Sequence, residues 1–513
     1  MSEFKNEKHT GDSSLVIRKT RRASMRKEVS ADFVLPDYMG EVKRVLKYTA
    51  HVIPCNKLIS DGEVSALATV TFRILYLNNE DMLTEASFST DAEFLEKIYV
   101  ESEDVDIEYK AQLVSVRLGG PRKISAKATV SCDMSILEDS EFGSNVDYNG
   151  AETLKKEIKT HTEEYLKTSE REYAEEIDKI EESTADEIEI VKSFAEAFID
   201  SVHKTDDGIN LSGYINAFCI LRSEDGLIRL EKQIPIEEHI ECEKYDGSEF
   251  LPKAHVTGVN VNLNNLTDDN RCAVSVVMNM TVECSVVHHY NKILCVVTDA
   301  FYEGCKNECC YENFEFSALC DTIFDKATLS FNLNRGEEPL RDIMESDICI
   351  KNARYELDGS ELTMFCDAEI TLIARGNSTE ELYAIKEKTE YSKKYRLTSK
   401  DTKKIWLSAI PCGVSVSFDT EKIYIEAQML ISLISESKDA IRMLSELRSE
   451  KKCDCSERNV VVYYPEKEDT LWSVSKKYGV ASEKVIRANG LLRSECDAET
   501  KIYEKGKIII ISE

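Results

Sequence analysis

The chain has 513 residues, a hydrophobic fraction of 42% and a formal net charge of −30 at pH 7. This length exceeds what one hydrophobic core supports and predicts about three or four domains of roughly 100–200 residues each, while the apolar fraction excludes disorder of the whole chain. So acidic a chain repels phosphate backbones, which argues against nucleic acid as a partner. No run of about 18 or more apolar residues occurs, so no membrane-spanning helix is expected.

Residues 1–30 form the first segment, which is rich in arginine and lysine but has no long apolar run. A secretory signal requires such a run, so export is not expected. The composition predicts a disordered basic tail. The alternative is an arm that docks on an acidic surface or on lipid headgroups.

Three later segments share one order of predicted strands. In each, two strands of alternating apolar and polar residues are joined by a charged turn, and a second pair of strands follows. In the first segment, Glu63–Tyr76 alternates apolar and polar residues, and Lys110–Leu137 supplies the second pair. A period of two marks strands that are buried on one face. We therefore predict a mainly β chain with helical linkers and three tandem β-rich, sandwich-like modules. These modules span residues 31–150, 203–305 and 306–437.

Two segments outside the modules are predicted to be helical. Residues 151–202 are dense in charge, and their apolar residues from Leu154 to Ile180 recur at roughly helical spacing, which predicts a charged linker helix. A partner-binding coiled coil is the alternative, although the heptads are not sustained. Residues 438–457 repeat the apolar spacing of a helix and predict a second linker helix.

The residue types that commonly carry catalysis or bind metals show no recognisable pattern. The chain lacks phosphate-binding glycine loops and the motifs of zinc proteases and serine hydrolases. Its 17 cysteines are odd in number and scattered, which indicates a reducing cytoplasm and no disulfide framework. The clusters at 305–310 and 453–455 lack the spacing of a zinc site. We therefore expect no enzymatic activity, no cofactor and no metal.

Residues 458–513 predict a compact β-α-α-β domain. Asn459–Tyr464 is a short apolar strand, and Asp469 or Thr470 can cap a helix that begins at Leu471. Gly479 ends this helix, because glycine readily adopts the left-handed conformation of a C-terminal cap. A second short helix and a final strand complete the domain; they span 482–490 and 507–511.

The stretch EDTLWSVSKKYGVASEKVIRANGL, which begins at Glu468, and the later KIYEKGKIIIIS together resemble the LysM domain family. The resemblance implies binding of N-acetylglucosamine polymers such as peptidoglycan in a groove between two loops, here Glu466–Leu471 and Asn489–Arg493. Glu468 departs from the family pattern, because it replaces a glycine that lets the loop approach a sugar closely. Ser512 also departs from it, since it replaces a proline.

A second resemblance covers most of the chain. Gly40–Val52, Lys123–Ile136 and Asp299–Glu303 (DAFYE) are similar to segments of the SPOCS-domain spore coat morphogenetic proteins of the SipL type, which are functionally akin to SpoVID. This resemblance implies a scaffold in the mother-cell cytoplasm, at the forespore surface within the spore coat. It also implies that the LysM domain binds the coat-basement ATPase, stage IV sporulation protein A, and that other coat proteins bind elsewhere.

The predicted partner-binding centre is apolar and aromatic, with polar residues that order its two loops. A protein that binds peptidoglycan at the cell wall is the alternative function, and it would use the same groove for sugar. The predicted residues of this centre are Trp472, Tyr463, Thr470, Leu471, Asn489, Leu491 and Leu492.

Overall fold

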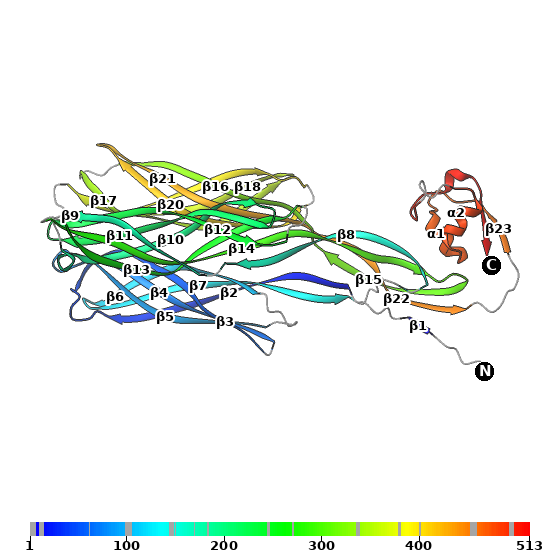
Figure 1. The fold of residues 1–513 in the computed structure, drawn as a ribbon, viewed down its shortest axis with the longest axis horizontal. Coiled ribbons are helices and arrows are strands. Elements are labelled where there is room, and N and C mark those ends of the chain that lie inside the picture. The colour runs from blue at the N-terminus through cyan, green and yellow to red at the C-terminus, as the bar shows by residue number, and fades with distance from the viewer. Residues whose placement is uncertain are drawn as a thin grey trace.

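In the computed structural model, three β-modules lie side by side and a small domain with two helices lies at one end (Figure 1). The predictions of a mainly β chain and of a C-terminal β-α-α-β domain are confirmed. No helix among the described residues is long and apolar enough to cross a membrane. The structure describes residues 7–9, 15–60, 62–97, 105–142, 148, 150–168, 170–181, 184–243, 247–268, 271–334, 339–377, 381–399, 402–451, 459–491 and 497–512.

The first module pairs two antiparallel three-stranded sheets around one core. The sheets have the strand orders β3-β4-β5 and β2-β7-β6. Phe72 of β4 and Val130 of β7 belong to the same buried cluster, so the two sheets pack face to face. Apolar and polar residues alternate along β4, as its burial pattern does. The strands are β2 (Leu15–Val34), β3 (Val42–Ser60), β4 (Glu63–Asn78), β5 (Leu83–Lys97), β6 (Val105–Gly120) and β7 (Lys123–Phe142).

The second and third modules repeat this topology. In the second, β10-β11-β12 forms one sheet. In the other sheet, β14 pairs with β13 on one side, and β8 and β9 pair with different parts of β14 on the other side. The third has the orders β17-β18-β19 and β16-β21-β20. The second module contains β8 (Glu152–Lys167), β9 (Arg171–Glu181), the 3-10 turn Ala185–Glu187, β10 (Glu189–Lys204), β11 (Gly208–Ser223), β12 (Gly226–Glu241), β13 (Glu249–Asp268) and β14 (Arg271–Phe301). The third contains β16 (Leu319–Asn334), β17 (Leu340–Asp358), β18 (Glu361–Gly376), β19 (Leu382–Arg396), β20 (Thr402–Phe418) and β21 (Lys422–Ser437).

The three modules meet in a shared apolar cluster. Each contributes one residue that bulges out of its ladder at the same place: Leu46 in β3, Val191 in β10 and Met344 in β17. These three residues belong to one buried cluster together with residues of the central strands β4, β11 and β18. A bulge re-aims a side chain relative to the regular pleat, and here it turns the same position of each module toward the other two.

A stem connects the modules to the C-terminal domain. β1 (Glu7–His9) and β15 (Cys305–Phe316) both pair with β22 (Asp439–Lys451), and β14 continues into this region beside β8. Figure 1 shows β8, β15 and β22 leading toward the two helices. The final domain contains β23 (Asn459–Tyr463), α1 (Leu471–Tyr478), α2 (Ser482–Ala488), the 3-10 turn Tyr503–Lys505 and β24 (Ile508–Ser512).

Three segments that were predicted to be disordered or helical contain strands, so those predictions are wrong. Within the predicted tail of residues 1–30, β2 pairs continuously with β7, from Leu15 opposite Phe142 onward. The predicted linker helix of residues 151–202 consists largely of β8, β9 and β10, and residues 438–457 contain β22. β14 supplies the hydrogen-bonding edge for β8 and β9, so distant pairing overrides local spacing.

Candidate functional site

The C-terminal domain is a two-stranded sheet packed on two short helices. Thr470 caps α1, because its hydroxyl oxygen accepts a hydrogen bond from the Ser473 backbone N–H at 3.1 Å while the Ser473 hydroxyl oxygen accepts one from the Thr470 backbone N–H at 3.0 Å. Gly479 ends the helix with φ 64°, in the left-handed region that favours glycine. The core of the domain is made of Leu471, Val474, Val480, Val485, Ile502, Ile508 and Ile510.

The loop before α1 is fixed by the segment that precedes β24. The backbone N–H groups of Leu471 and Trp472 donate to the carbonyls of Thr500 (3.0 Å) and Ala498 (2.9 Å). An ion pair of 2.8 Å between Lys501 and Glu468 joins the same two segments. Because these N–H groups at the start of the helix are already bonded, they are not free to donate to a ligand.

The loop after α2 is held by the side chain of Asn489. Its amide group donates to the carbonyls of Val485 at 2.8 Å and Ile509 at 2.7 Å, and its oxygen accepts from the Ile509 backbone N–H at 2.7 Å. Leu491 follows, with its backbone N–H bonded to the Ile486 carbonyl. Asn489 therefore orders this loop, as the sequence predicted.

Of the predicted site residues, Trp472 has the position that fits a partner-binding role least. Its side chain is buried, and its contacts lie at the end of β14. The indole Nε1 donates to Asp299 Oδ2 at 2.8 Å, and its ring packs edge-to-face on Phe301 at a centroid distance of 5.2 Å. Lys476 pairs with the same Asp299 carboxylate. Trp472 therefore fixes the domain to the rest of the chain.

Asp299 is ionised in this contact. Burial alone raises the pKa of its carboxyl, but hydrogen bonds from Lys476, Trp472 and Tyr311 outweigh burial and hold the pKa below its ordinary value. Glu303, in the turn that connects β14 to β15, pairs with Lys484 at 2.9 Å. The segment Asp299–Glu303, which the sequence singled out as DAFYE, is thus the docking point for the C-terminal domain.

The remaining predicted residues divide by exposure. Tyr463, Thr470, Asn489 and Leu491 are half-buried and reach the surface, whereas Leu471 lies in the domain core. Leu492 lies outside the described residues. Direct contact of Leu471 or Trp472 with a partner would require them to leave their present packing, and a partner-binding role for the others stays a prediction.

Sequence reasoning missed an apolar surface on the outer face of the two-stranded sheet. Val460, Val462 and Tyr464 alternate along β23 and its end, and their exposed fractions are 63%, 52% and 69%. Ile511 of β24 lies opposite Val460 and is also exposed. The alternation of Asn459–Tyr464 carried this signal, because in a two-stranded sheet packed on helices one face must remain outside. We refer to these four residues as the outer sheet face.

Comparisons with known proteins identify this domain. Residues 466–494 match the LysM domain family, which confirms the predicted C-terminal LysM domain. LysM domains are binding modules of the kind that recognise peptidoglycan and related carbohydrates. No curated protein and no solved structure matches the chain significantly.

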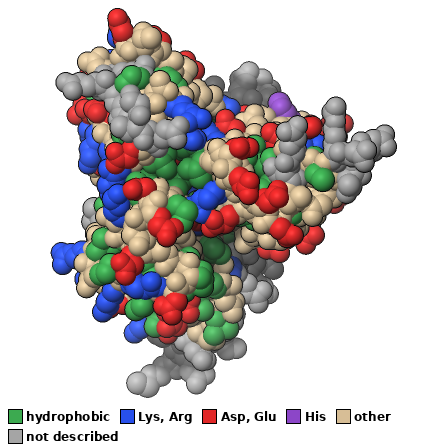
Figure 2. Space-filling model, turned by 90° about the vertical axis from the view of Figure 1, so that its left-hand side faces the viewer, with side chains coloured by type: hydrophobic (Ala, Val, Ile, Leu, Met, Phe, Trp, Pro, Cys, Tyr) green, Lys and Arg blue, Asp and Glu red, His purple; other side chains and the backbone are tan. Residues whose placement is uncertain are grey.

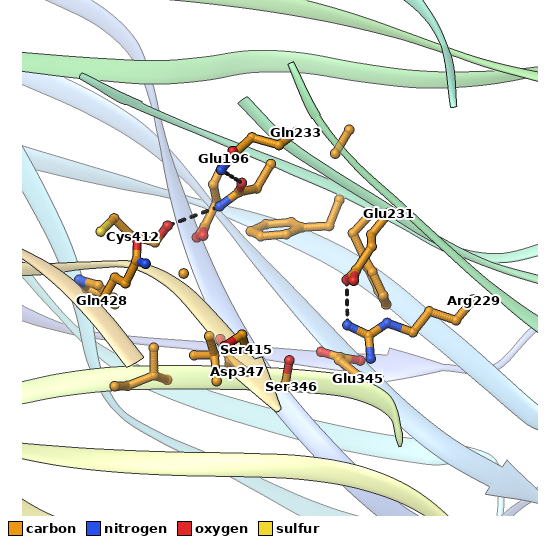
Figure 3. A pocket seen from close by; sticks show the side chains of 18 of the residues that line it. Glu196, Arg229, Glu231, Gln233, Glu345, Ser346, Asp347, Cys412, Ser415 and Gln428 are labelled. Carbon is orange, nitrogen blue, oxygen red and sulfur yellow. Dashed lines mark hydrogen bonds and ion pairs between the residues drawn. The ribbon is translucent and has the colours of Figure 1, made fainter. Parts of the chain in front are cut away.

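A second candidate site is a cavity of about 460 Å³ where the three modules meet (Figure 3). Several of its charged lining residues are paired with one another: Glu345 binds both Lys47 and Lys192, and Arg229 binds Glu231. Acidic and basic side chains are likewise interspersed on the end of the molecule remote from the LysM domain (Figure 2). Ion pairs inside the cavity fasten modules to one another, so the cavity is explained by assembly of the fold.

Proposed function

We propose that this chain is a non-enzymatic scaffold whose LysM domain docks a protein partner through the outer sheet face. Val460, Val462, Tyr464 and Ile511 offer an apolar surface, and this observation carries the proposal. Apolar patches on an otherwise charged protein mark interaction sites, and aliphatic anchors suit a protein surface because they offer no hydrogen bond to the hydroxyl groups of a sugar.

The resemblance to the SPOCS-domain spore coat proteins supplies the identity of the partner. It implies the coat-basement ATPase, stage IV sporulation protein A, in the mother-cell cytoplasm at the forespore surface, with other coat proteins as further partners. The arrangement of the chain suits such a role, because the contacts of Asp299 and Glu303 hold the LysM domain at one end of a long β-body. A domain held in this way presents its outer face at a fixed distance from the modules.

Binding of peptidoglycan is the alternative function, and the family match favours it. Two features of the first loop argue against a sugar in the expected groove. Glu468 occupies the position of the family's glycine, and its ion pair with Lys501 joins the loop to the segment before β24. A sugar would have to compete with that ion pair. It would also have to compete with the Thr500 and Ala498 carbonyls, which already accept hydrogen bonds from the backbone N–H groups at the start of α1.

The proposal is tested by capture experiments with the full chain. The double variant Val460→Glu/Val462→Glu places two charges on the outer sheet face, and we expect it to bind the ATPase at least about tenfold more weakly, since a central apolar anchor contributes about 1–2 kcal/mol. Val34→Glu is the matched control, because Val34 is a valine of similar exposure (65%) on β2, outside the LysM domain.

Purified peptidoglycan is the second bait. Retention of the wild-type chain on peptidoglycan, together with undiminished capture of the ATPase by the double variant, would overturn the proposal in favour of the alternative. Circular dichroism of each variant establishes that the fold is retained, which is expected because both valines are largely exposed.

A further inference from the structure

A cluster of buried metal-binding side chains lies on the second module, away from the LysM domain. His161 and Glu163 project from the same face of β8, being two residues apart, and His289 lies directly opposite Glu163 on β14. All three side chains are at most 5% exposed. The antiparallel register therefore gathers two imidazoles and one carboxylate at one buried point.

The spacing of these ligand atoms fits a tetrahedral metal. The three ligand atoms form a triangle. His289 Nδ1 lies 3.1 Å from His161 Nε2 and 3.6 Å from Glu163 Oε1, and the distance between His161 Nε2 and Glu163 Oε1 is 4.0 Å. Zinc bonds of about 2.0–2.2 Å at tetrahedral angles place neighbouring ligand atoms about 3.4 Å apart. An ion at the centre of the triangle therefore needs shifts of only a few tenths of an ångström.

The surroundings orient the ligands as an outer shell does in a metal site. Glu436 of β21, in the third module, accepts a hydrogen bond from His161 Nδ1 at 2.8 Å, which leaves Nε2 of that ring directed at the cluster. Arg22 of β2, in the first module, and the Tyr165 hydroxyl both bind the Glu163 carboxylate. The outer shell thus draws on all three modules.

His289 directs its Nδ1 into the cluster, where this atom lies close to His161 Nε2 and Glu163 Oε1. Its Nε2 is buried without a hydrogen-bond partner among the described residues. The nitrogen that faces the cluster, Nδ1, is therefore the one through which His289 can bind an ion.

We propose that His161, Glu163 and His289 bind a divalent transition-metal ion, Zn²⁺, as a structural site at the junction of the three modules. Two imidazoles and a carboxylate form a ligand set that zinc accepts. The carboxylate oxygen has two lone pairs, so Glu163 can retain Arg22 while it coordinates the ion. The three ligand side chains are at most 5% exposed, and a water molecule would fill the fourth tetrahedral position.

The test is a calorimetric titration of the metal-free full chain with ZnCl₂. Exposed cysteines such as Cys55 and Cys310 also bind zinc, so they are alkylated first. We expect one Zn²⁺ per chain, an affinity lowered at least tenfold in His289→Ala, and no change in His239→Ala, whose ring is partly exposed on β12. The absorption spectrum of the Co²⁺ complex should show tetrahedral ligation without a thiolate-to-metal charge-transfer band.

Glu436→Gln keeps the proposal testable if His289→Ala fails to fold. This isosteric change removes the charge that orients His161, and loss of an outer-shell partner typically weakens metal binding about 10–100-fold. The Co²⁺ complex of the variant should keep its tetrahedral spectrum, which a general loss of structure would not. Absence of stoichiometric binding by the thiol-blocked wild-type chain, or equal affinity in Glu436→Gln and wild type, would overturn the proposal.

Discussion

Replacing Glu345 with glutamine tests whether charge pairing holds the three modules together. Glu345 of β17 accepts from Lys192 of β10 at 2.8 Å and from Lys47 of β3 at 2.5 Å, so one carboxylate joins all three modules. The three side chains are at most 9% exposed. Glutamine has nearly the same shape, so the substitution removes the charge without creating a cavity.

The expected loss can be worked out in two ways. Removing one partner of a buried ion pair costs about 3–5 kcal/mol, and here the lower end applies, because Lys47 keeps Asp347 at 2.8 Å and Lys192 keeps Glu85 at 3.7 Å. Burial raises the pKa of Glu345, but the two lysines outweigh burial and lower the pKa from 4.5 to about 2. At about 1.4 kcal/mol per pH unit, this corresponds to about 3 kcal/mol.

The two routes agree on the size of the effect and also fix its pH dependence. A carboxyl whose folded-state pKa is lowered stabilises the fold above its unfolded pKa, and that contribution is lost as the pH falls from 4.5 toward 2. In urea titrations, Glu345→Gln should therefore lower the free energy of unfolding by about 3 kcal/mol at pH 7 and by much less near pH 2.5. The control is Glu381→Gln, which removes an exposed pair with Arg44 and should cost less than about 1 kcal/mol.

A loss below about 1 kcal/mol at pH 7, or a loss of the same size at pH 2.5, would refute this reasoning. The first result would mean that the lysines find other partners when the carboxylate is gone. The second would mean that the side chain acts through its shape and hydrogen bonds rather than its charge.

Three further substitutions test other parts of the structure. Asp299→Asn weakens the hold on Trp472, so the LysM domain should detach more readily and the tryptophan fluorescence should shift to the red, whereas unchanged emission would contradict the docking contact. Asn489→Ala removes three hydrogen bonds and should destabilise the LysM domain by about 2–4 kcal/mol, measured as a lower Tm by calorimetry. Desolvation by the surrounding cavity walls raises the pKa of Glu196 to about 7, so its ionisation disfavours folding as the pH rises above 4.5. Glu196→Gln should therefore be more stable than wild type at pH 8 by about 1 kcal/mol, a value reduced because the side chain is exposed to solvent in the cavity, and the two should converge near pH 4.

Local patterns predicted the elements whose partners are near in the sequence. The alternation in Glu63–Tyr76 corresponds to β4, and its hairpin partners flank it directly. In the LysM domain, the predicted start at Leu471 and the end at Gly479 both agree with α1, because caps are encoded by adjacent residues. Hairpins and caps depend on short-range chemistry, so sequence periodicity suffices to predict them.

Elements with distant partners were not predictable in this way. β8 pairs with a part of β14 that follows it by more than 100 residues, so its pairing partner cannot be read from local spacing. The contact of Trp472 with Asp299 is of the same kind, since 173 residues separate them. The sequence marked both ends of this contact as notable, but no spacing rule relates them.

The module junction shows why three similar folds assemble in one order. The residue after each bulge occupies an equivalent place in its module, and it is lysine in β3, lysine in β10 and glutamate in β17. Three copies of the first module would bring three buried ammonium groups together, which repel one another and lack the central carboxylate that Glu345 supplies. A single glutamate among two lysines converts that repulsion into pairing, and in this chain the third module supplies it. Divergence at Glu345 is therefore a condition for packing the modules against one another, and Glu345→Lys should abolish their association rather than weaken it.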